Sequence, residues 1–139
     1  MKEKPVLRVV SKILIAPIML FALYVQFHGD FGPGGGFQAG VIFASAFIIY
    51  ALIYGGRASR AVAPPWVTRL CLVIGVLLYA GTGIVGMLLG GNYLNYSVLA
   101  DDHHAGQHLG IMVIEFGVGM TVAAAMITIF NTFARYRND

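Results

Sequence analysis

Four stretches of the chain are each long and apolar enough to cross a membrane as a helix. A bilayer core about 30 Å thick requires about 20 mainly apolar residues, because a helix rises about 1.5 Å per residue. Lipid offers no hydrogen-bond partner to a bare backbone, so a spanning segment satisfies its own amides by forming a helix. We therefore predict an all-α integral membrane protein, a single domain over residues 1–139, with transmembrane helices at about residues 9–27, 37–54, 67–89 and 109–133.

Composition supports a membrane protein and argues against a soluble one. Of the 139 residues, 58% are hydrophobic and 11% are charged, which is too apolar for a soluble domain of this length. The net charge of +3 does not indicate a nucleic-acid partner, because the basic residues stand in short segments between the apolar stretches rather than on one basic face. We expect the lipid bilayer to surround this chain.

The positions of the basic residues predict how the chain is oriented. Lys and Arg concentrate in cytoplasmic segments of membrane proteins. The segments 28–36 and 91–108 contain no Lys or Arg, so we expect both outside. An N-in, C-in protein places the other three segments inside, and these hold Lys2, Lys4, Arg8, Lys12, Arg57, Arg60, Arg69, Arg135 and Arg137.

Glycine is abundant in the third apolar stretch. Small residues let helices approach closely where packing must drive their association. This surface predicts contacts with other subunits, although packing within one four-helix unit would use the same residues. The glycines concerned are Gly75, Gly81, Gly83, Gly86 and Gly90.

A glycine-rich segment, 28–40, precedes the second apolar stretch. It lacks the Lys and the Ser or Thr of a P-loop, so it does not indicate a nucleotide site. Its glycines instead allow irregular, closely packed backbone, which persists near a membrane only where protein or water covers it. We interpret it as a motif in which shape is critical, consisting of Pro33, Gly34, Gly35, Gly36, Phe37, Gln38 and Gly40.

A second polar segment, 101–108, precedes the fourth apolar stretch. His104 and His108 are four residues apart and would share a helix face, so a metal site with Asp101 is one alternative. Acidic residues before a helix also act as caps, and this is the reading we prefer. We expect no metal here, and we regard Asp101, His104 and His108 as candidates for the entry of an ion or proton path.

Glu115 is the only charged residue well inside an apolar stretch. A carboxylate in a membrane is costly, and it usually faces a polar cavity or a partner group. Glu115 is therefore our first candidate for an ion or proton path. A structural glutamate paired at an interface is the alternative. Helical periodicity places His108, Ile111, Met112, Gly119 and Val122 on the face of Glu115.

The two motifs resemble those of the MnhB family, one of the membrane subunits of Mrp-type multisubunit sodium/proton antiporters, which also has relatives in membrane-bound hydrogenases. The resemblance rests on Pro33-Gly-Gly-Gly-Phe-Gln-Ala-Gly40 after His28-Gly29, and on Gly110-Ile-Met-Val-Ile-Glu-Phe-Gly-Val-Gly-Met-Thr-Val122 after the histidine segment. It covers essentially the whole chain.

The resemblance implies an accessory subunit in a prokaryotic plasma membrane. Its partners would be the other subunits of an Mrp-type complex, and sodium ions and protons would be the transported species. The alternative is a purely structural subunit of a related hydrogenase or complex I-like assembly. We do not expect an enzyme, and we expect no cofactor, because none of the four histidines lies deep in a span as a haem ligand would.

Overall fold

The computed structural model describes residues 5–29 and 34–136, with side chains as far as Ala134. This part of the chain is all helical, and four of its helices are long and apolar enough to cross a membrane, which confirms the predicted fold class. The long helices are α1 (Pro5–Phe27), α2 (Gly36–Tyr54), α4 (Pro65–Leu88) and α5 (His103–Tyr136). Two short elements join them: α3 (Gly56–Val62) and a 3₁₀ helix, η1 (Tyr96–Leu99).

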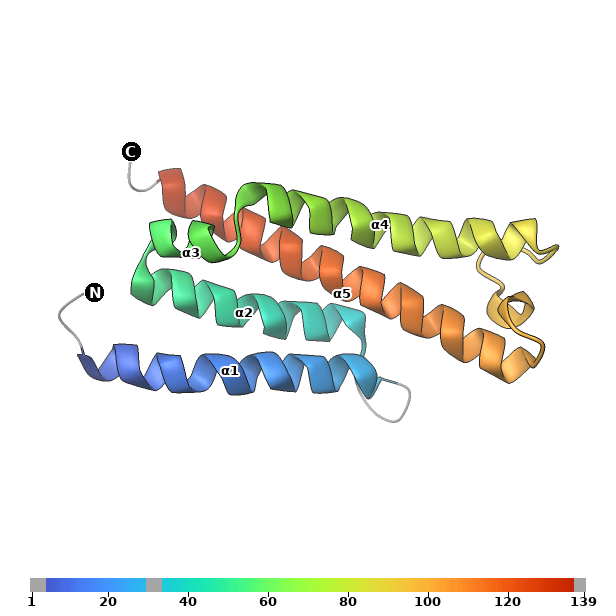
Figure 1. Ribbon diagram of the computed structural model, residues 1–139, viewed down its shortest axis with the longest axis horizontal. Helices are drawn as coiled ribbons and strands as arrows, with labels where there is room; N and C mark the ends of the chain where they lie inside the picture. The colour runs from blue at the N-terminus through green and yellow to red at the C-terminus, as the bar shows by residue number, and fades with distance from the viewer. Residues whose placement is uncertain (1–4, 30–33, 137–139) are drawn as a thin grey trace.

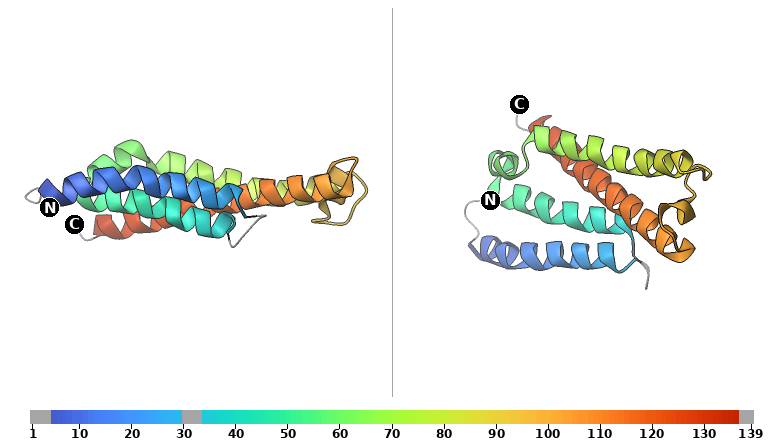
Figure 2. Two further views of the ribbon diagram at one scale, coloured as in Figure 1. Left: turned by 90° about the horizontal axis from the view of Figure 1, so that it is seen from below. Right: turned by 45° about the vertical axis from the view of Figure 1, so that its right-hand side comes forward.

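The four long helices lie side by side in one layer, in the order α1, α2, α5, α4 (Figure 1). The view along the layer in Figure 2 shows that it is thin. Helix α5 crosses the layer at a slant, contacts both α2 and α4, and meets α1 only slightly. Below, the "terminal end" is the end that holds α3, the start of α1 and the end of α5, and the "loop end" is the opposite one.

Helix α5 begins at His103, earlier than the predicted span at residue 109. The reason is a cap: the Ala105 amide donates a hydrogen bond of 3.3 Å to the Asp102 carboxylate, which satisfies one free donor of the first turn. At about 1.5 Å per residue, 34 residues extend about 51 Å, well beyond a bilayer core of about 30 Å. The first turns of α5 therefore project past the loop ends of α1 and α2 (Figure 1).

The segment between α2 and α4 contains a helix that the sequence did not predict. Helix α3 starts after Gly55, whose φ of 90° ends α2 and turns the chain. Ser59 in α3 is 1% exposed, and its hydroxyl donates a 3.5 Å hydrogen bond to the side-chain oxygen of Asn131 in α5. This contact ties the short helix to the layer.

Glycine lets α4 and α5 touch backbone to backbone. A Cβ on Gly75 would overlap Thr121 and come 2.6 Å from the Gly117 carbonyl oxygen. Gly83 is likewise covered by the Tyr93 ring, whereas a Cβ on Gly81 would meet nothing within 4 Å. Packing within the unit therefore accounts for Gly75 and Gly83, and Gly81 lies on an open face.

The described basic side chains belong to segments at the terminal end. Arg8 and Lys12 are in the first turns of α1, Arg57 and Arg60 are in α3, and Arg69 is near the start of α4. The Arg8 guanidinium lies 5.3 Å from the centre of the Tyr54 ring, and so links the start of α1 to the end of α2. The charge segregation matches the sequence pattern, and the inward orientation of this end stays a prediction.

Candidate functional site

The two sequence motifs meet in space, around the carboxylate of Glu115. A Cβ on Gly29 would lie 3.0 Å from Glu115 Oε2, and one on Gly35 would lie 3.2 Å from Oε1. Gly29, after α1, and Gly35, before α2, thus approach the carboxylate with glycine backbone. Any larger residue at these two positions would place a side chain in the space next to the carboxylate.

The start of α2 is pressed against α5 at the same level. A Cβ on Gly36 would overlap the backbone carbonyl of Glu115, so no other residue fits there without moving a helix. Gly35 precedes it with φ 128° and ψ 172°, a conformation essentially reserved for glycine. One turn later, a Cβ on Gly40 would come 2.6 Å from the Gly119 carbonyl oxygen. Gly35, Gly36 and Gly40 therefore determine how closely α2 lies on α5.

Glu115 lies at the loop end of α1 and α2, although it is about 18 Å along α5 from His103. It faces an open pocket of about 350 Å³. Predicted motif residue Pro33 is outside the described part of the chain. The pocket is lined by Gly34, Gly35, Gly36, Phe37, Gln38, Glu115 and Val118.

The other residues predicted for the ion path lie before Glu115 in the chain, in the part of the molecule that projects beyond α1 and α2 (Figure 1). Asp101, His104 and His108 are exposed, and they are not among the described residues that line the Glu115 pocket. His108 lies two turns before Glu115 on α5, about 10 Å away along the axis. Within the described residues, no three His, Cys, Asp or Glu side chains are grouped to hold a metal ion.

The loop before α5 folds back on these first turns. A Cβ on Gly110 would overlap the Tyr96 ring, and one on Gly106 would come 2.6 Å from the Tyr96 carbonyl oxygen. Burial raises the pKa of the Tyr96 hydroxyl, and the nearby Tyr79 and Tyr93 add to this effect. The hydroxyl is therefore neutral at physiological pH, and η1 adds no charge beside the histidines.

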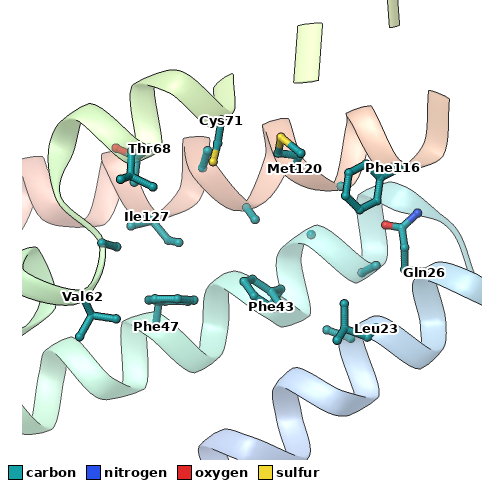
Figure 3. A pocket seen from close by; sticks show the side chains of 18 residues that line it. Leu23, Gln26, Phe43, Phe47, Val62, Thr68, Cys71, Phe116, Met120 and Ile127 are labelled. Atoms are coloured by element: carbon teal, nitrogen blue, oxygen red, sulfur yellow. The ribbon is translucent and has the colours of Figure 1, made fainter. Parts of the chain in front are cut away.

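A groove of about 370 Å³ opens on one face of the layer, where α5 slants away from its neighbours (Figure 3). Its lining comes from α1, α2, α4, α5 and the end of α3, and nearly all of it is apolar. Gln26 is the exception at the loop end: it is 9% exposed and points from α1 toward α5 (Figure 3). The sequence analysis did not single out Gln26, although an amide within an apolar stretch was a usable signal.

These features define a multi-span helical membrane protein with a half-buried carboxylate where the glycine-rich start of α2 meets α5. The chain belongs to the family described as "Domain related to MnhB subunit of Na+/H+ antiporter", whose family model matches residues 6–128. It is a multi-pass plasma-membrane protein.

Relatives from two staphylococci match almost end to end. A protein of Staphylococcus haemolyticus (strain JCSC1435) named "Putative antiporter subunit mnhB2" is 33% identical, over 93% of this chain and 94% of the relative. A protein of the same name from Staphylococcus aureus (strain Newman) is 34% identical, with the same coverage of both chains. The resemblance inferred from the two motifs is confirmed.

Proposed function

We propose that this chain is a small membrane subunit of a multisubunit sodium/proton antiporter, and that Glu115 takes part in handling the ion or proton. Membership of the MnhB family and the names of the staphylococcal relatives support the first part. The other subunits of such a complex are its partners, and sodium ions and protons are the transported species.

The surroundings of Glu115 support the second part. A carboxylate in a span is costly unless it meets a polar partner or water. Glu115 opens to a pocket at the loop end, and the glycines around it bring polar backbone within a few ångströms of both carboxylate oxygens. A carboxylate in such a place can exchange a proton for a cation without leaving the helix junction. Asp101, His104 and His108 stay candidates for the entry side of this path.

The chain is proposed to have no catalytic chemistry of its own. Among the described residues that line the Glu115 pocket, the polar groups are the Glu115 carboxylate, the Gln38 amide and the backbone, which suit the binding of a proton or cation. A purely structural role, joining larger subunits through the uncovered faces of the layer, is the second candidate. It is favoured by the large apolar side chains that the single layer leaves exposed, such as Leu88 at 81% and Phe133 at 72%.

Replacing Glu115 in the native complex separates these functions. Glu115→Gln keeps the shape and removes the charge, so we expect normal assembly and exchange reduced at least about tenfold, the effect of about 1.4 kcal/mol. Glu115→Asp keeps an ionisable group and should retain part of the activity. Sodium-driven proton movement in membrane vesicles and the yield of purified complex are the two measurements. If the Gln variant assembles and exchanges like the parent at every pH, the structural role is correct.

A further inference from the structure

Two oxygen atoms converge on one point of α5, a single turn from Glu115. Gly119 has no side chain, and a Cβ placed on it would overlap Gln26 Oε1 and come 3.1 Å from the Gly36 carbonyl oxygen. Gln26 comes from α1, Gly36 from α2 and Gly119 from α5. The side-chain-free position on α5 is therefore faced by an amide oxygen and a backbone oxygen from two other helices.

The helix register links this point to Glu115. Gly29 of the α1 end faces the Glu115 carboxylate, and Gln26, three residues earlier, faces Gly119, four residues after Glu115. The two contacts are thus neighbours along the line where the end of α1 runs antiparallel to α5. Glu115 lines the pocket at the loop end, whereas Gln26 and Gly119 line the groove on the face of the layer. Glu115 thus lines one of the two openings, and Gln26 lines the other.

We propose that Gln26 Oε1 and the Gly36 carbonyl oxygen form a second cation site, which takes a monovalent cation one turn further along α5 than Glu115. This inference rests on the proposed function of Glu115. Hard cations bind carbonyl and amide oxygens, and rings of such oxygens replace the water around an ion in membrane pathways. An amide stays uncharged and does not take up a proton near neutral pH, so this second site binds the cation and leaves the proton to Glu115.

Buried glutamine can also serve only as packing, and two substitutions separate these roles. Gln26→Met keeps the length and volume of the side chain but removes the amide. Gln26→Asn keeps the amide but shortens the side chain by one carbon. A cation site predicts that the Asn variant retains more activity than the Met variant, whereas a packing role predicts the reverse order.

The experiment measures sodium-driven proton exchange by the native complex in vesicles, over a range of sodium concentrations, with complex yield measured in parallel. We expect Gln26→Met to assemble normally and to need about tenfold more sodium for half-maximal exchange, the loss expected when one buried polar contact is removed. Thr128→Val is the matched control, since that hydroxyl bonds only to the Ala124 carbonyl of its own helix among the described contacts. It should leave the sodium dependence unchanged.

Three results would overturn the proposal. These are a Met variant with the sodium dependence of the parent, a Met variant that fails to assemble while the parent does, and an Asn variant weaker than the Met variant. Glu115→Gln, measured beside them, tests the proposed function separately. If Glu115→Gln lowers exchange and Gln26→Met does not, only the second site is wrong. If Glu115→Gln has no effect, the path through Glu115 is wrong, and the second site with it.

Discussion

At the scale of single residues, the space around the Glu115 carboxylate depends on neighbouring glycines that have no side chain. Gly29 and Gly35 leave space beside its carboxylate oxygens, and Gly36 lets α2 reach its backbone. The sequence singled out Glu115 for its charge and the glycines for their number, and it treated the two as separate features. The amide of Gln26 within an apolar stretch was a usable signal, but only the structure shows that it faces Gly119 of α5.

Gly35 offers the sharpest test of the glycine loop. Gly35→Ala forces a Cβ into a backbone conformation with φ 128° and to within 3.2 Å of Glu115 Oε1, so we expect a loss of about 1–3 kcal/mol in stability. The melting temperature and yield of the purified complex should both fall. Gly81→Ala is the control, because Gly81 is helical and a Cβ there meets nothing within 4 Å. It should be neutral or stabilise by up to about 1 kcal/mol. Equal melting temperatures for the two variants would contradict the prediction.

At the scale of elements, close contacts between small residues hold the helices together. The buried apolar residues are almost all alanine, and α4 meets α5 where Gly75 faces Gly117. Lipid removes the hydrophobic difference between the inside and the outside of the layer, so such close packing supplies the association. The start of α5, by contrast, is determined locally, because the Asp102 carboxylate accepts a hydrogen bond from the Ala105 amide in the first turn.

The attachment of α3 provides a prediction about one element. Ser59→Ala removes the hydroxyl that donates to Asn131, and such a bond contributes about 1 kcal/mol. We expect backbone amides of α3 to exchange with solvent about fivefold faster, while α1 and α2 keep their rates. Hydrogen exchange followed by mass spectrometry measures this directly. Ser45→Ala is the control, since Ser45 donates to Ile42 of its own helix, and unchanged α3 exchange in both variants would disprove the role of Ser59.

At the scale of the whole molecule, a single layer of helices leaves two broad apolar faces. No described long helix is enclosed on all sides. In each of the four, at most 33% of the most apolar 18-residue stretch is buried within the protein. Lipid can cover such faces, and so can other subunits of a complex. The layer also separates the basic terminal end from the loop end, which carries Glu115 and the exposed histidines.

This separation predicts which end faces the cytoplasm. In a Cys71→Ser background, which removes the only cysteine, Asp101→Cys should react with a membrane-impermeant thiol reagent in intact cells. Arg57→Cys, at the opposite end, should react only after lysis. Both positions are exposed, so reactivity reports the side of the membrane. The reverse pattern of labelling would show that the termini lie outside.

The sequence alone determined the four long helices, their ends to within six residues and the segregation of charge, because hydrophobic length, capping and basic flanking residues act locally. The tertiary structure decided the order α1, α2, α5, α4, the approach of Gly29 and Gly35 to the Glu115 carboxylate and the position of Gln26 over Gly119. These contacts join residues far apart in the sequence and depend on how each helix is rotated and shifted against its neighbour. In lipid, that register follows from the fit of small residues at helix crossings, which an apolar pattern does not encode.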